Sequence, residues 1–227
     1  MNQISLKDIF SADVTPPAII LVEGEAGTLK STLCFGMMLN LLAHCPDSHG
    51  LYMTFEQTWQ SHVSNMISMG YQPPGSLHSV DYNIMRKEAA LQQDAVNVFT
   101  SITGMIDALY NEKKGNLSIF ALDSLNAVYS IAEPQLLESS LIPFFRKLRE
   151  YNMISLIINE CQMDENNSHM RERFLADGIV SLGILRRQGE VSRYLQALKF
   201  SQGEHSLRRR QVVLGRDGIK IQGEVYR

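Results

Sequence analysis

Nine consecutive residues near the N-terminus, positions 24–32, carry the clearest chemical pattern in the sequence. They read GEAGTLKST and resemble the phosphate-binding loop G-x-x-x-x-G-K-[ST], with a leucine in place of the second glycine. In such a loop the backbone N–H groups form an anion-binding nest, the lysine bridges phosphate oxygens and the hydroxyl that follows it holds Mg²⁺. The residues expected to bind a nucleotide are Gly24, Glu25, Ala26, Gly27, Thr28, Leu29, Lys30, Ser31 and Thr32.

Leu29 is the residue that departs from this pattern. Its Cβ stands where the backbone usually lies close to the phosphates, and we expect the loop to accept it only with a negative φ. The departure is expected to lower the affinity for nucleotide or the rate of its reaction. The alternative interpretation is a glycine-rich turn between a strand and a helix, with no ligand.

Two acidic residues follow other apolar runs and complete a candidate site for phosphate chemistry. Asp123 comes directly after the run 117–122, where a carboxylate that helps to hold Mg²⁺ belongs in proteins with a phosphate loop. Glu56 ends the run 50–55, a position from which a carboxylate can orient or deprotonate a water molecule. Each also has a plain structural interpretation, Asp123 as a helix or turn cap and Glu56 as an exposed residue at a strand end.

The segments around these residues alternate between strand-like and helix-like patterns. Short apolar runs predict buried strands, and apolar residues three and four apart predict helices. The predicted strands are 18–22, 50–55, 77–80, 117–122 and 154–158, and the predicted helices are 30–43, 58–69, 91–109 and 134–151. Strands separated by helices favour right-handed crossovers and an α/β fold with a mostly parallel central sheet flanked by helices.

The pattern changes at residue 178. From there the apolar runs are short, lack a helical period and are separated by QGE at 188–190 and RDG at 216–218. They predict antiparallel β-hairpins that extend one edge of the sheet. We therefore predict a single domain over residues 1–227, with 1–17 as an N-terminal lead-in and 178–227 as a C-terminal hairpin extension.

These motifs occur in an order that resembles a known family. GEAGTLKST, TFEQ, ALDSLNAV, IINE, FLADGIVSL and ALKFSQGEH follow one another as in the single-domain KaiC-like branch of the RecA superfamily of ATPases. The resemblance covers residues 18–221 and implies a RecA-like P-loop NTPase fold that binds ATP, with Mg²⁺ held by Ser31 and Asp123. It also implies a homo-oligomer, a ring or a filament, with nucleotide near the boundary between subunits.

The resemblance also assigns catalytic roles, from which this sequence departs at two positions. In these proteins a Glu-Glu pair activates water; here a glutamine follows Glu56, so Glu56 is the expected base. A Lys-x-Arg pair, followed by a histidine, reaches the neighbouring subunit's nucleotide; here Lys199 and His205 match, while Ser201 replaces the arginine. Because such an arginine is worth ~10³-fold or more in rate, we expect slow ATP hydrolysis that depends on Lys30, Glu56 and Lys199.

Composition limits the classes of protein that this chain can represent. Of its 227 residues, 44% are apolar and 20% are charged, which is typical of a folded globular protein. The polar start of the chain and the lack of 18 consecutive apolar residues argue against a signal peptide and a membrane-spanning helix. Three widely spaced cysteines favour reduced thiols, so we expect a cytoplasmic protein without membrane insertion.

Charge is distributed unevenly along the chain. Residues 181–227 hold 10 Lys and Arg against 4 Asp and Glu, a net charge of +6, whereas the first 180 residues hold 11 against 20, a net charge of −9. This asymmetry suggests that the basic end meets a phosphate ligand, a nucleic acid or the acidic face of another subunit. On charge alone, the favoured interpretation is a solvated basic face. The main hypothesis is a nucleotide-dependent oligomeric regulator with weak ATPase activity and an unidentified protein partner.

Two other functions remain open at this point. One is a non-hydrolysing, nucleotide-gated scaffold, similar to the accessory ATPase-fold proteins of the archaeal motility apparatus. The other is a RecA-type recombinase paralogue that binds DNA, since the polar segment 162–173 falls where RecA-type proteins carry a DNA-facing loop. Its acidic residues offset Arg171 and Arg173, so we interpret it as a mobile surface loop. The basic run 208–210 lacks the interleaved aromatic residues that stack on single-stranded nucleic acid.

Overall fold

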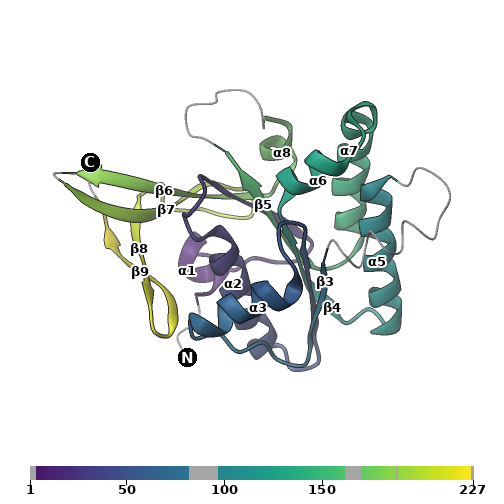
Figure 1. Ribbon diagram of the computed structural model, residues 1–227, viewed down its shortest axis with the longest axis horizontal. Coiled ribbons are helices and arrows are strands. Elements are labelled where there is room, and N and C mark those ends of the chain that lie inside the picture. Colours follow the sequence, from purple (N-terminus) through teal and green to yellow (C-terminus); the bar gives the residue numbers. More distant parts are fainter. Residues whose placement is uncertain (1–3, 82–96, 162–169, 188, 226–227) are drawn as a thin grey trace.

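The computed structural model describes residues 4–81, 97–161, 170–187 and 189–225 of the chain. These residues form a nine-stranded sheet with helices on both faces (Figure 1). The strands are β1 (Ala18–Gly24), β2 (His49–Thr54), β3 (Leu77–Asp81), β4 (Leu117–Asp123), β5 (Ile154–Glu160), β6 (Gly178–Arg187), β7 (Glu190–Phe200), β8 (Arg210–Gly215) and β9 (Gly218–Glu224). The helices are α1 (Leu6–Phe10), α2 (Lys30–His44), α3 (Trp59–Ser68), α5 (Val98–Glu112), α6 (Leu125–Ile131), α7 (Pro134–Glu150) and α8 (Met170–Leu175).

The strand order in the sheet is β3-β2-β4-β5-β1-β6-β7-β8-β9. Neighbouring strands from β3 to β6 in this order run parallel, and those from β6 to β9 run antiparallel. This arrangement confirms the predicted fold class, a mostly parallel α/β sheet that ends in antiparallel hairpins. Because parallel strands end at the same edge of a sheet, β1, β2 and β4 bring their last residues to one place.

Side chains of the parallel strands alternate between two apolar layers, so both faces of the sheet are buried. In β1, Ile20 and Val22 belong to the layer that contains α1, α2 and α3. Ile19 and Leu21 belong to the layer that contains α5, α6 and α7. All four side chains are at most 1% exposed. The strand that leads into the candidate phosphate loop is therefore enclosed from both sides.

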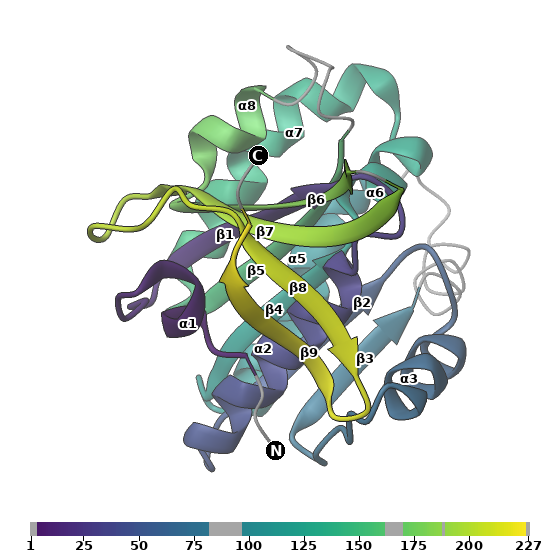
Figure 2. The same cartoon turned by 90° about the vertical axis from the view of Figure 1, so that its left-hand side faces the viewer.

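The C-terminal hairpin of β8 and β9 folds over α2 (Figure 2). Val212 and Ile219 join the apolar layer on that face. The Tyr71 hydroxyl accepts a hydrogen bond from the Ile219 N–H at 3.0 Å. Its ring lies between Gly36 and Gly218, and a Cβ at Gly218, where φ is +94°, would lie 2.7 Å from that ring. This joint ties the last strands to α2.

Most predicted elements agree with the structure to within a few residues. The strand expected at 77–80 is β3, and the helix expected at 134–151 is α7. Of the helix expected at 91–109, residues 91–96 lie outside the described part of the chain, and the remainder belongs to α5. The short helices α1, α6 and α8 were not predicted, and the single domain over 1–227 stays a prediction. No helix among the described residues is long and apolar enough to cross a bilayer.

Candidate functional site

The predicted phosphate loop lies at the carboxyl edge of the parallel strands. β1 ends at Gly24 and α2 begins at Lys30, so the loop is closed by the N-terminus of a helix. Gly24 accepts no side chain, because a Cβ there would lie 2.1 Å from the carbonyl oxygen of Leu182 on β6. Thr28 is fully buried, and its hydroxyl donates to the Glu25 carbonyl at 2.7 Å, which holds the loop together from within.

Lys30 points into this loop. Its Nζ donates to the carbonyl oxygens of Gly24 and Glu25, at 2.9 and 2.8 Å, and lies 3.9 Å from Glu160 Oε1 at the end of β5. Only 10% of the Lys30 side chain is exposed, so its charge is confined to the concave side of the loop. The arrangement places a cation where an anion would meet the loop N–H groups.

The prediction of a negative φ at Leu29 was wrong. The residue has φ of +75°, in the left-handed region, which costs roughly 1–2 kcal/mol for a residue with a Cβ. Its side chain packs against the apolar layer of α2, and its carbonyl accepts the Leu33 N–H at 2.9 Å in the first turn of that helix. Packing therefore lets leucine adopt the backbone conformation that a glycine would take readily.

Asp123 ends β4 and is 2% exposed. The Tyr52 hydroxyl donates to its Oδ2 at 2.6 Å, whereas its Oδ1 has no hydrogen-bond partner among the described residues. Burial raises the pKa of Asp123 to about 6, and Ser31 and Lys30 lie close enough to oppose that rise. A buried carboxylate oxygen without a donor, beside a hydroxyl, fits Mg²⁺, which prefers oxygen ligands and keeps several waters. Ser31 and Asp123 could therefore hold this ion.

Glu56 lies beside Asp123, as the adjacency of β2 and β4 requires. It is exposed, and its Oε1 accepts a hydrogen bond from the Ser124 hydroxyl at 2.5 Å. The negative charge of Glu56 contributes to the raised pKa of Asp123. The structure thus brings together the predicted residues Lys30, Ser31, Asp123 and Glu56 at one edge of the sheet.

The partly exposed Gln57 side chain contacts a buried histidine. Its Nε2 lies 2.9 Å from Nδ1 of His62, and its Oε1 accepts a bond from the Ser61 hydroxyl at 3.4 Å. His62 is fully buried, and burial lowers its pKa to about 4, so its ring is neutral near pH 7 and accepts the amide N–H. The rings around it are those of Phe35, Tyr52 and Trp59. A carboxylate at position 57 would meet the lone pair of this ring.

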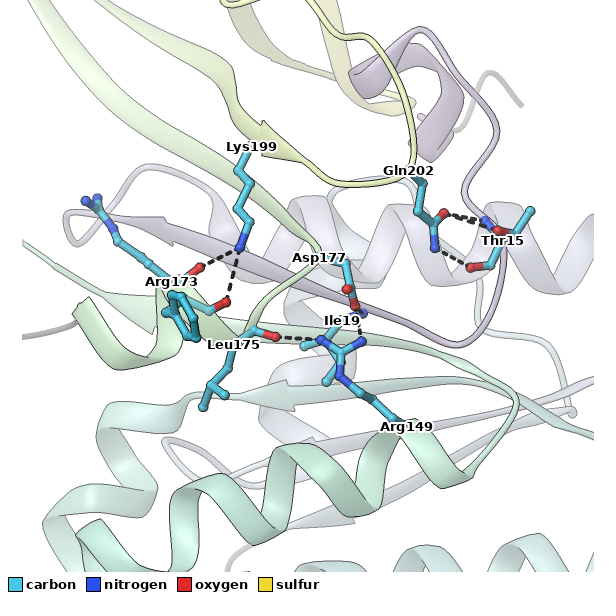
Figure 3. Close-up of polar contacts among 9 residues, drawn as sticks. Thr15, Ile19, Arg149, Arg173, Leu175, Asp177, Lys199 and Gln202 are labelled. Atoms are coloured by element: carbon cyan, nitrogen blue, oxygen red, sulfur yellow. Dashed lines mark hydrogen bonds and ion pairs between the residues drawn. The ribbon is translucent and has the colours of Figure 1, made fainter.

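Lys199 contacts α8 of its own chain (Figure 3). Its Nζ donates to the carbonyl oxygens of Arg173 and Phe174 at 3.1 and 3.2 Å. The next carbonyl, that of Leu175, accepts a bond from the Arg149 guanidinium at 2.7 Å. Two basic side chains therefore cap the last turn of this short helix.

The other C-terminal residues of the predicted site, Ser201 and His205, lie near the contact between Lys199 and α8. The Ser201 N–H donates to the Asp177 carbonyl at 2.7 Å, and half-buried His205 packs its ring against Phe200. The structure does not bring Lys199 together with Lys30. Its action across a subunit boundary stays a prediction.

Arg193 contacts the loop, and no sequence pattern marked it. Its Nε donates to the Gly27 carbonyl at 2.9 Å, although 166 residues separate the two positions. The contact exists because β7 turns back antiparallel to β6, which itself pairs with β1. A second cation therefore lies at the mouth of the loop.

The prediction of a surface loop over 162–173 was wrong for Arg173. Residues 162–169 lie outside the described part of the chain, and 170–175 form α8. The Arg173 guanidinium binds both carboxylate oxygens of Glu23, with Nε to Oε2 at 2.8 Å. Glu23 is fully buried, directly before Gly24. An acidic residue inside the buried run AIILVE was the signal that a cation must cover it.

The basic run at 208–210 is engaged within the chain. Arg208 pairs with Glu224, and the Arg209 guanidinium lies 4.6 Å from the centre of the Tyr194 ring. Arg210 donates to two backbone carbonyls near the end of α1. These contacts agree with the interpretation that the run is not a stacking platform for nucleic acid.

Comparison with known proteins places the chain in a family. Residues 5–226 match the KaiC ATPase family. The crystal structure of a KaiC-like protein from the hyperthermophilic archaeon Pyrococcus horikoshii OT3 matches with a TM-score of 0.79 and 18% sequence identity, covering 96% of this chain and 95% of that chain. No curated protein matches the sequence. The structural match supports the fold, and the sequence match over nearly the whole length shows that this chain belongs to the KaiC family of nucleotide-binding ATPases.

Proposed function

We propose that this protein binds ATP at residues 24–32 and hydrolyses it slowly with Mg²⁺, as a nucleotide-dependent regulator that forms homo-oligomers. The observation that carries the proposal is the confined cation of Lys30 inside the loop, beside the Ser31 hydroxyl and the buried Asp123 carboxylate. Membership of an ATPase family supports the same proposal.

Each residue of the site has a role in this proposal. The loop N–H groups and Lys30 bind the β- and γ-phosphates, and Arg193 adds positive charge at the mouth of the loop. Ser31 and Asp123 would hold Mg²⁺, which when bound would supply positive charge to the phosphates. Glu56, fixed by Ser124, orients the attacking water or takes its proton.

Slow hydrolysis is proposed because two expected groups are replaced. Gln57 cannot accept a proton, and its amide is engaged with His62. Ser201 cannot supply the positive charge of an arginine to a neighbouring subunit, which leaves Lys199 as the proposed cation there. If the parent protein binds ATP but releases no phosphate, the non-hydrolysing scaffold replaces the ATPase proposal.

Ligand-induced stabilisation tests the binding step. Excess ATP with Mg²⁺ should raise the melting temperature of the parent, because a ligand at 100 times its Kd stabilises by about 2.7 kcal/mol. Lys30→Ala should remove most of this rise. Lys7→Ala is the matched control, since Lys7 forms an exposed ion pair with Asp13 on the lead-in and should leave the rise intact. Equal stabilisation of parent and Lys30→Ala would show that residues 24–32 are not the ATP site.

Sizing by light scattering tests the oligomer. The acidic body and the basic end of neighbouring subunits should attract each other, so assembly with Mg-ATP should weaken at high salt. A monomer in every condition, with and without Mg-ATP, would exclude both the ring or filament and the role of Lys199 across a subunit boundary.

A further inference from the structure

Two histidines near the amino ends of β2 and β3, at the other end of the strands from the phosphate loop, direct ring nitrogens at each other. His49 begins β2, and His78 is the second residue of β3, the edge strand. The register pairs Leu51 with His78, so His49 and His78 are diagonal neighbours on one face of the sheet. His49 Nδ1 and His78 Nε2 are 3.1 Å apart.

This separation is close to that of two ligands of one tetrahedral ion. A zinc ion about 2.0–2.1 Å from each nitrogen would hold the two nitrogens about 3.3 Å apart. Without metal, one ring donates its proton to the other. Moving that proton to the far nitrogen of the same ring leaves two lone pairs facing the ion, with no net loss of protons.

The backbone around both histidines is fixed. The His49 N–H donates to the Asn116 carbonyl at 2.8 Å, and the Gly50 N–H donates to the Ser76 carbonyl at 3.0 Å. Both rings are half-buried, which restricts their rotation. The two imidazoles are therefore preorganised on a rigid element, which is what a metal site needs.

Two charged side chains, those of Lys113 and Glu112, act on the His78 ring, Lys113 more strongly than Glu112. Glu112, at the end of α5, has a side chain that is 66% exposed, and its charge acts on the His78 ring. Its Oε1 accepts a bond from Lys113 Nζ at 2.7 Å, so it must turn from Lys113 to reach an ion. Among the described residues no three potential ligands already surround one point. The imidazole pair is thus the preformed part, and Glu112 is the part that moves.

We propose that His49 and His78, joined by Glu112, bind a divalent ion of the zinc type. Imidazole suits zinc and similar ions, whereas Mg²⁺ prefers oxygen, so this site and the proposed Mg²⁺ site select different metals. β2 spans six residues, or roughly 20 Å, between its two ends. The two sites are therefore separate. An ion here would fasten the edge strand β3 to β2.

Metal titration of the full-length protein tests the site. Co²⁺ is followed by its visible absorption and Zn²⁺ by calorimetry, in a Cys45→Ser background because Cys45 is an exposed thiol near His49 in sequence. The parent should bind one ion per chain, and Zn²⁺ should raise its melting temperature. His49→Asn and His78→Asn should each lose the binding. His44→Asn, at an exposed histidine whose Nδ1 contacts the Asn40 carbonyl, is the matched control and should keep it.

Charge variants next to the pair sharpen the test. Lys113→Gln should tighten Zn²⁺ binding because it removes a cation and frees the carboxylate of Glu112, whereas Glu112→Gln should weaken it. Circular dichroism with a chelator present checks that each variant folds. If the parent binds no Zn²⁺, or His78→Asn and His78→Gln bind it as tightly as the parent, the proposal is wrong. Unchanged affinity for Zn²⁺ in Glu112→Gln would show that the Glu112 carboxylate is not a ligand of the ion.

Discussion

Arg193 on β7 donates from Nε to the carbonyl oxygen of Gly27 in the phosphate loop, 2.9 Å away. The contact joins the antiparallel end of the sheet to the loop that follows its parallel centre. It also places a guanidinium, which carries five N–H donors, against the same loop that confines the ammonium of Lys30. The candidate site is therefore built from both ends of the chain.

Removing this guanidinium should weaken ATP binding. A hydrogen bond to a charged group contributes about 1.5–3 kcal/mol, so Arg193→Ala should raise the Kd for ATP roughly 10- to 100-fold, as measured by calorimetry. Arg193→Lys should recover part of the loss. Arg187→Ala, at an exposed arginine on β6, is the matched control. Equal affinity for ATP in Arg193→Ala and Arg187→Ala would show that Arg193 does not contribute to nucleotide binding.

Replacing the expected base should stop hydrolysis without preventing binding. A positioned general base contributes ~10²- to 10⁴-fold, so Glu56→Gln should release no measurable phosphate in a steady-state assay. ATP should still raise its melting temperature. Ser124→Ala, which removes the donor to Glu56, should lower the rate less than Glu56→Gln does. A variant Glu56→Gln that turns over ATP as fast as the parent would contradict the assignment.

The left-handed conformation of Leu29 leads to a prediction with two opposing variants. Leu29→Gly relieves backbone strain but loses packing, so its free energy of unfolding should stay within about 1 kcal/mol of the parent. Leu29→Ala keeps the strain and loses the packing, so it should be the less stable of the two in urea unfolding. Leu29→Gly should also bind ATP more tightly, because the backbone can approach the phosphates. A glycine variant less stable than Leu29→Ala would show that the left-handed backbone at position 29 carries no strain.

The raised pKa of Asp123 predicts how stability depends on pH. Because its folded-state pKa of about 6 lies above the ordinary value of 3.8, the folded state holds this proton more tightly than the unfolded chain does. Its stabilising contribution is complete below pH 4 and is lost as pH rises through 6. Asp123→Asn should therefore stabilise the nucleotide-free protein at pH 7.5, by on the order of 2 kcal/mol, and much less at pH 4.

Urea unfolding at these two pH values measures the effect. The same variant should lose most of the stabilisation by Mg-ATP, since a neutral amide holds Mg²⁺ poorly. A variant that is equally destabilised at both pH values would show that the carboxylate is not under electrostatic strain in the fold.

Gln57 and His62 give a prediction about the missing glutamate. Gln57→Glu should raise the pKa of His62 from about 4, because a carboxylate stabilises the protonated ring, and NMR titration of the imidazole measures this. Together with Ser201→Arg, the substitution restores the family pattern and should raise the hydrolysis rate. Should the pKa of His62 remain near 4 in Gln57→Glu, the two side chains are not in contact.

The elements that local patterns mark were predictable, and those that depend on distant contacts were not. The strand before the loop and the helix after it follow from an apolar run, glycines and helical spacing, and they occur as predicted. The short helices α1, α6 and α8 have too few turns to show a period. Leu29 combines a left-handed backbone with packing against the apolar layer around α2, which no local spacing reveals.

Contacts across the fold account for the rest of the site. The pair of Arg173 with Glu23 spans 150 residues, and the bond from Arg193 to Gly27 spans 166. Both depend on which strands flank β1. The alternation of strands and helices predicted a parallel sheet but left the strand order open. Because the sequence did not show that β5 and β6 flank β1, it could not identify these two contacts.

The position of β1 in the sheet has a consequence for the newly made chain. β1 is synthesised before both of its neighbours in the sheet, β5 and β6, which are the fifth and sixth of the described strands in sequence. At 5–20 residues per second, the roughly 150 residues between Gly24 and β6 take about 8–30 s to synthesise. During that time the loop segment has neither flanking strand, nor the arginines of α8 and β7. The proposed nucleotide site can therefore be complete only after β6 and β7 have been synthesised.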